Sequence, residues 1–166
     1  TWNTKCGIAN YANNLIKNID HKLFIFAPYS SSLVGHDESN VFRCWNLNRP
    51  FTDEIKNKIL EKKITTMIIQ FNYGFFDFSS FNDFISFLVE NNIIIIIQMH
   101  STRDPIENPC KSQKNILNSL VSVNRLLVHT CSDLNRLKSH NLINNVSIFP
   151  HGILYFKKTI SSKRFN

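Results

Sequence analysis

Five consecutive isoleucines, Ile93 to Ile97, are the feature that most restricts how this chain can fold. They open the segment IIIIIQM (residues 93–99), which shows no alternation of apolar and polar side chains. A strand that is apolar on both faces must be covered on both, as in the centre of a parallel sheet flanked by helices. We therefore expect residues 93–99 to form a central strand, with these isoleucines almost fully buried.

Helical and strand-like segments alternate along the rest of the chain, which is typical of a doubly wound α/β fold. Helices are predicted from Ile8, from Thr52 (with Ile55, Ile59 and Leu60 buried), and over residues 78–90, 111–123 and 132–139; strands are predicted over residues 22–27, 41–45, 65–71, 93–99, 126–129 and 146–149. The fold class is thus α/β, a Rossmann-like parallel sheet of about six strands. No strand precedes the first helix, so we expect a truncated first strand upstream of Thr1.

The length of 166 residues suits one domain with a core of its own. The formal charge is +7, but the lysines and arginines are scattered and form no stripe interleaved with aromatic residues. The composition therefore disfavours a nucleic-acid partner. It favours weak attraction to an anionic surface or to a phosphate-bearing ligand.

The four cysteines, at positions 6, 44, 110 and 131, are far apart and form no C-x-x-C pair. This pattern favours reduced thiols and a cytoplasmic location over a disulfide framework or a zinc site. The longest apolar run is too short to cross a bilayer, and no secretory signal is present. We expect a soluble protein without a bound metal.

Polar residues recur where the predicted strands end. In open α/β sheets ligands bind at the carboxyl ends of the strands. Five short clusters occupy such places or the start of the first helix: Cys6-Gly7, Asn72-Tyr73-Gly74, His100-Ser101-Thr102-Arg103-Asp104, His129-Thr130-Cys131-Ser132 and Pro150-His151-Gly152. Their repetition predicts a binding site along this edge of the sheet.

Each cluster also has a purely structural interpretation. Gly7 suits a turn before a helix, and Ser132 suits a helix N-cap. Pro150 with Gly152 suits a turn, and a histidine at a strand end is often structural. The chain has no G-x-G-x-x-G, P-loop, G-x-S-x-G or D-x-D motif, which weakens dinucleotide, nucleotide-hydrolase, esterase and metal-dependent interpretations.

Four segments resemble a known family in the correct order. TWNTKCGIANYANNLI (residues 1–16) resembles the "CGIAEYS/T" opening of bacterial GT-B sugar transferases in the large retaining family four. IIQFNYGFF (68–76) resembles their "QYEFGLF" segment, and QMHSTRD (98–104) their "TLHST" segment. Residues 125–153 resemble the stretch that closes the N-terminal domain. The similarity covers the chain up to Ile153.

The resemblance implies a Rossmann-like acceptor-side domain over residues 1–153, with residues 154–166 starting a linker or tail. A C-terminal domain, missing here, would hold a GDP- or UDP-sugar, and the acceptor would be a glycan or a lipid-linked molecule. The nucleotide-sugar is a substrate, so neither a cofactor nor a metal is implied. Peripheral contact with the inner membrane face is also expected.

The resemblance also assigns roles to residues. His100 would act near the transferred sugar and the acceptor hydroxyl. The donor phosphates and the cleft would be lined by Cys6, Gly7, Ser132, Pro150, His151 and Gly152; the acceptor side would be formed by Asn72, Tyr73, Gly74, Ser101 and Arg103.

Two departures from the family pattern matter. Asn72 stands where many relatives carry Glu or His, and nothing after Ile153 resembles a second domain with its E-x7-E motif. We therefore expect this chain alone to be inactive. Two alternatives stay open: a non-catalytic Rossmann-like module that binds a glycan or a protein, and a nucleotide-sugar epimerase of similar architecture.

Overall fold

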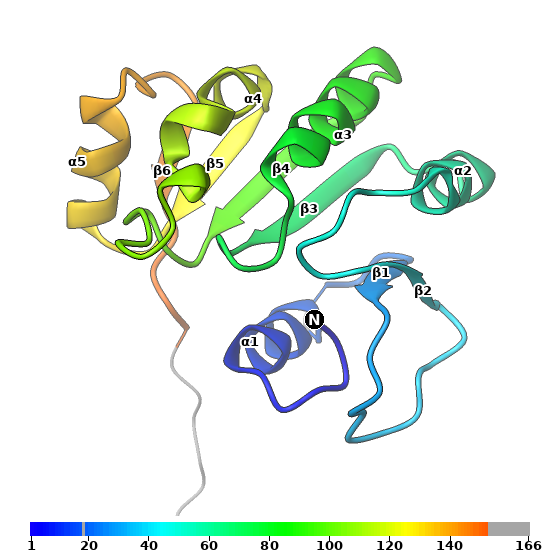
Figure 1. Cartoon of the computed structure of the whole chain (residues 1–166). Helices are drawn as coiled ribbons and strands as arrows, with labels where there is room; N and C mark the ends of the chain where they lie inside the picture. The colour runs from blue at the N-terminus through cyan, green and yellow to red at the C-terminus, as the bar shows by residue number, and fades with distance from the viewer. Residues whose placement is uncertain (18, 153–166) are drawn as a thin grey trace, which may run out of the picture.

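The computed structural model describes residues 1–17 and 19–152 (Figure 1). Strands and helices alternate along these residues as the sequence predicts. In chain order the elements are α1 (Gly7–Ile16), β1 (Ile25–Pro28), β2 (Val41–Trp45), α2 (Asp53–Glu61), β3 (Thr66–Phe71), α3 (Phe78–Glu90), β4 (Ile94–Met99), the 3₁₀ turns Pro109–Lys111 and Gln113–Ile116, α4 (Leu117–Ser122), β5 (Arg125–Val128), α5 (Cys131–Ser139) and β6 (Val146–Ile148). The predicted tail, residues 154–166, lies outside the described residues.

All strand pairs are parallel, which confirms the α/β, Rossmann-like class. Strands β3, β4, β5 and β6 form a four-stranded sheet in that order, so β4 is an interior strand. In the described part of the chain, β1 and β2 pair with each other and not with this sheet. The single sheet expected from the sequence is thus divided into a two-stranded and a four-stranded sheet.

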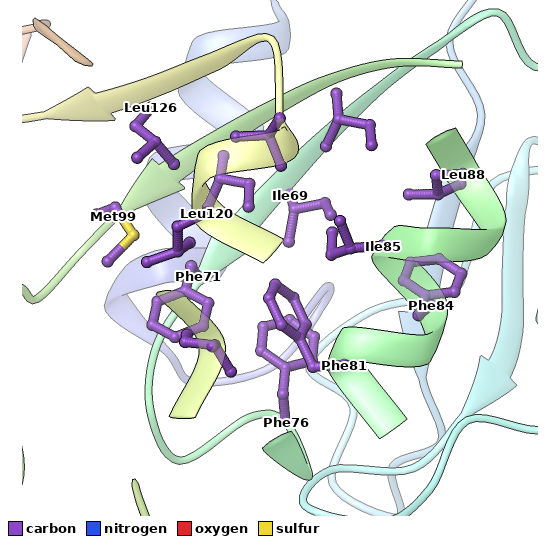
Figure 2. Packing of buried hydrophobic residues seen from close by; sticks show 14 of the residues in the cluster. Ile69, Phe71, Phe76, Phe81, Phe84, Ile85, Leu88, Met99, Leu120 and Leu126 are labelled. Atoms are coloured by element: carbon purple, nitrogen blue, oxygen red, sulfur yellow. The ribbon is translucent and has the colours of Figure 1, made fainter. Parts of the chain in front are cut away.

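The main core lies between the four-stranded sheet and helices α3 and α4 (Figure 2). Ile95 and Ile97 of β4 point into it and are fully buried. The predicted apolar side of α3 faces them: Phe81, Phe84, Ile85 and Leu88 are all buried. Burial of each such side chain contributes about 1.5–3 kcal/mol, so this layer holds β3 and β4 against α3.

The prediction that Ile93 to Ile97 are almost fully buried is wrong for Ile94, which is 48% exposed, and for Ile96, which is half-buried. Alternate residues of a strand face opposite sides of the sheet, so Ile94 lies on the face away from α3. Helix α1 lies on that side (Figure 1). It has 10 residues and is therefore about 15 Å long. It covers Gln98, at the carboxyl end of β4, and leaves Ile94 uncovered.

Two helix predictions are wrong in detail. Leu60, expected to be buried, is 50% exposed, because it lies one residue past the inward stripe of Ile55 and Ile59. The helix predicted over residues 111–123 is two 3₁₀ turns followed by the short α4. Ser112 interrupts it, since its backbone is extended and its hydroxyl accepts a hydrogen bond from the Lys114 amide.

Side chains and single hydrogen bonds join the two sheets along what we call the inter-sheet seam (Trp45, Asn48, Phe75, Phe76 and Lys111). The Trp45 ring stacks on Phe76 with centroids 5.5 Å apart. The Asn48 amide donates to the Phe75 carbonyl at 2.7 Å. The Lys111 ammonium donates to Asn48 Oδ1 at 2.7 Å and to the Phe76 carbonyl. The seam therefore replaces a backbone ladder between the sheets.

Candidate functional site

A hollow of about 520 Å³ lies where β3 and β4 end, against the start of α1. It is lined by Cys6, Gly7, Ile8, Tyr11, Asn72, His100 and His151. Four of the five clusters that the sequence places along this edge thus contribute to one hollow. The structure brings together residues from near both ends of the described chain.

Tyr11 of α1 stands at the centre of three histidines. Its ring meets those of His100, His129 and His151 edge-on, with centroids 5.2, 5.6 and 5.3 Å away. The His129 and His151 rings stack on each other with centroids 3.6 Å apart. The fifth predicted cluster therefore reaches the site through His129, behind the residues that line the hollow.

A chain of side-chain hydrogen bonds fixes the His100 and Tyr11 rings. His100 Nε2 lies 2.6 Å from Gln70 Oε1. Because an amide oxygen only accepts, Nε2 carries the proton and Nδ1 keeps a free lone pair. The Gln70 amide donates to Gln98 Oε1 at 3.2 Å, and the Gln98 amide donates to the Tyr11 hydroxyl at 2.5 Å. One continuous polar network therefore runs from β3 and β4 to α1.

Two histidines of the site, His100 and His129, are held neutral. Burial, with smaller contributions from His129 and His151, lowers the pKa of His100 to about 4. Burial also lowers the pKa of His129, although the Phe149 carbonyl, which accepts a hydrogen bond from its Nδ1 at 3.0 Å, acts in the opposite direction. Near neutral pH these two imidazoles therefore carry no positive charge, and His100 offers the lone pair of its Nδ1.

The start of α1 forms another wall of the hollow. A Cβ at Gly7 would meet no atom within 4 Å, so the space above its backbone is open. The free N–H groups of a helix N-terminus and its dipole attract anions. Burial acts to raise the pKa of the Cys6 thiol, but hydrogen bonds from Thr1 and from the first amides of α1 outweigh it, so this pKa is lowered. This wall is suited to a negatively charged group.

Several predicted acceptor-side residues have structural partners. The Tyr73 hydroxyl is buried and donates to Asp104 at 3.1 Å. Asn72 Oδ1 accepts from the Gly74 amide at 3.0 Å. The Ser101 hydroxyl donates a hydrogen bond to the Arg103 carbonyl at 3.5 Å. Of this group, Asn72 is the residue that lines the hollow.

The N-cap of α5 is Thr130, so the structural interpretation of Ser132 as an N-cap is wrong. The Thr130 hydroxyl accepts from the Asp133 amide at 3.1 Å. Ser132 lies exposed in the first turn of α5, outside the lining of the hollow. Pro150 and Gly152 flank His151 and are exposed, and they too lie outside the lining.

Sequence reasoning misses three residues that build the site. Tyr11 lies at helical spacing among apolar residues of the first helix, so the sequence suggests core packing. In the structure its hydroxyl accepts a hydrogen bond from Gln98 and its ring contacts the three histidines. Gln70 and Gln98 lie in otherwise apolar strands, at paired positions of β3 and β4. Two glutamines near the ends of two apolar strands are a signal that could locate them.

No helix in the described ranges, residues 1–17 and 19–152, is long and apolar enough to cross a membrane. The same residues contain no group of three or more His, Cys, Asp or Glu side chains placed to hold a metal ion. In particular, the three imidazoles around Tyr11 contact that ring edge-on, and those of His129 and His151 stack on each other. The side chains that line this hollow offer hydrogen bonds, and the start of α1 offers an attraction for anions.

Fold and site together define a parallel α/β protein with a histidine-lined hollow at the carboxyl ends of its strands. Comparison of the chain with protein-family models, with curated proteins and with solved structures finds no match.

Proposed function

We propose that this chain is the acceptor-side domain of a retaining GT-B glycosyltransferase that acts in the cytoplasm, in peripheral contact with the membrane. It works with a C-terminal domain that binds a GDP- or UDP-sugar, and the acceptor is a glycan or a lipid-linked molecule. The observation that supports this most is the hollow that gathers Cys6, Gly7, Asn72, His100 and His151 at one edge of the sheet. These residues come from all four segments that resemble the family.

The chemistry of sugar transfer fits the two walls of the hollow. Departure of a nucleoside diphosphate leaves negative charge on the phosphate and positive charge on the sugar ring. The open backbone at Gly7 and the N-terminus of α1 suit the phosphate. His100 is neutral and has a free Nδ1, which suits a hydrogen bond from a sugar or acceptor hydroxyl.

The test is a His100→Ala variant of the chain extended by its natural C-terminal continuation. Transfer from GDP- and UDP-sugars to glycan and prenyl-phosphate acceptors is measured. We expect kcat to decrease by about 10²–10³, with a much smaller change in the donor KM, because one contact made in the transition state is lost. His21→Ala, which changes an exposed histidine on the segment before β1, is the matched control.

The outcomes separate this proposal from its rivals. Unchanged kcat per folded His100→Ala molecule removes His100 from the site. Binding of a glycan without turnover by any nucleotide-sugar supports a non-catalytic module instead. Robust transfer by the 166-residue chain alone contradicts the proposal that a second domain is needed.

A further inference from the structure

A second hollow, also of about 520 Å³, lies against the N-terminal segment that leads into the candidate site. One wall is the stretch Thr1 to Lys5, and the other is the loop that follows β1. Residues 6 and 7, which come directly after Lys5, line the first hollow. The two hollows therefore share one short segment of chain.

The second hollow is lined by polar residues and by large apolar side chains that are open to solvent. Tyr29, Leu33, Val34 and Leu47 line it and are 48, 42, 59 and 40% exposed. Large apolar side chains scattered singly on a surface need no explanation, but several around one concavity mark a binding surface for an apolar group.

The charge of this hollow is positive. Lys5 carries a side-chain positive charge, and none of the described residues that line the hollow is acidic. The Glu54 carboxylate contacts this lining, because it accepts a hydrogen bond from the Tyr29 hydroxyl at 2.9 Å. The Lys5 end therefore suits an anion, and the Tyr29 end does not.

Hydrogen bonds hold the walls in place. The Arg43 guanidinium donates to the Pro28 carbonyl at 2.5 Å and to the Trp2 carbonyl at 3.1 Å, and so ties the end of β1 to the N-terminal segment. The Val34 amide donates to the Asn3 carbonyl at 2.8 Å. The hollow is therefore a preformed feature, which reduces the ordering cost of binding.

We propose that this second hollow binds a single-chain lipid phosphate, with the apolar chain against Leu33, Val34 and Leu47 and the phosphate at Lys5. A sugar or a free nucleotide would leave the apolar wall in water, and an uncharged lipid would leave Lys5 without a partner. The role of this ligand as the acceptor of a transferred sugar rests on the proposed function. The binding site itself does not.

The test uses the 166-residue chain with octyl phosphate, below the concentration at which it forms micelles, and no nucleotide-sugar. We expect saturable binding by isothermal titration, with amide shifts in NMR spectra at residues 1–5 and 29–34. Lys5→Gln should weaken binding about tenfold, because a charge-assisted hydrogen bond is lost. Val34→Ser should weaken it several-fold through loss of apolar contact.

Matched controls are Lys114→Gln and Ile106→Ser, which change an exposed lysine and an exposed apolar residue outside the hollow. Both should bind octyl phosphate as the unchanged chain does. Inorganic phosphate and octyltrimethylammonium should each bind at least about tenfold more weakly than octyl phosphate. Equal affinity of Lys5→Gln and the unchanged chain would overturn the proposal, as would shifts that map elsewhere.

Vesicles of phosphatidylglycerol distinguish a membrane surface from a single lipid. Binding to vesicles without binding of monomeric octyl phosphate would replace the proposed site by a surface interaction. If octyl phosphate binds here but the extended protein transfers no sugar, the lipid-phosphate site stands and the proposed function fails. If the extended protein transfers sugar but octyl phosphate does not bind, the proposed function stands and the lipid-phosphate site fails.

Discussion

His100 combines a half-buried ring with a fixed proton. Its Nε2–H is used by Gln70, so only Nδ1 is available to a ligand or to a proton from solvent. The lowered pKa means that taking up this proton is unfavourable while the chain is folded. The stability of the fold should therefore depend on pH through this residue.

We expect the free energy of unfolding to decrease as pH falls from about 6.5 to about 4. Above this range His100 is neutral in both states and has no effect. Within it, the unfolded chain binds a proton that the folded chain does not. His100→Gln should flatten the decrease, measured by urea unfolding at about pH 7 and about pH 4.5, and some slope should remain from His129, whose pKa is also lowered.

The control for this experiment is His21→Gln, which alters an exposed histidine and should keep the original slope. A His100→Gln protein with unchanged pH dependence would show that the ring is not held neutral by burial. Glutamine is chosen because its amide can still donate to Gln70 without titrating.

Gly7→Ala separates a structural glycine from one that keeps a binding surface open. The added Cβ meets no atom within 4 Å, so we expect unchanged thermal stability or a gain of up to about 1 kcal/mol. Affinity for GDP or UDP, measured by titration calorimetry on the extended protein, should decrease because the methyl group stands over the α1 amides. Gly35→Ala, where a Cβ also meets nothing, is the control and should leave affinity unchanged. A large loss of stability in Gly7→Ala would favour the turn interpretation.

At the scale of elements, β4 shows how far a sequence pattern reaches. The run of isoleucines predicts an interior parallel strand, and that is confirmed. The same run cannot tell which face lacks a cover, because all five side chains are identical. Ile94 is exposed because it lies on the face away from α3 and is left uncovered there.

Two neighbouring isoleucines of β4 should respond very differently to truncation. Ile95→Ala removes a fully buried side chain from the core and should cost about 2–5 kcal/mol. Ile94→Ala removes a half-exposed one and should cost at most about 1 kcal/mol. Urea unfolding of both variants measures the difference directly. Similar losses would mean that the face around Ile94 is covered in solution.

The candidate site shows the same limit. Its members at strand ends could be predicted, because parallel strands bring their carboxyl ends to one edge. The position of Tyr11 could not, since an aromatic residue at helical spacing is typical of core packing. The role of Tyr11 depends on Gln98, which pairs with Gln70 across the sheet and donates a hydrogen bond to the Tyr11 hydroxyl.

At the scale of the whole molecule, the division into two sheets should be visible in hydrogen exchange. Strands β1 and β2 are joined to the larger sheet by the inter-sheet seam and not by a ladder of backbone bonds. We expect amides of β1 and β2 to exchange through openings of lower free energy than those of β4. Lys111→Met should widen this gap, and Lys114→Met should not. Equal protection of β1 and β4 would show one cooperative unit.

The seam also determines how the molecule would respond to force. Parallel ladders loaded along their strands have to break several backbone hydrogen bonds together. Along the seam, the force would act in turn on one backbone hydrogen bond, on the hydrogen bonds of Lys111 and on one pair of stacked rings. A tether attached near Thr1 would therefore separate the small sheet first, and β3 to β6 would still carry tension after that rupture.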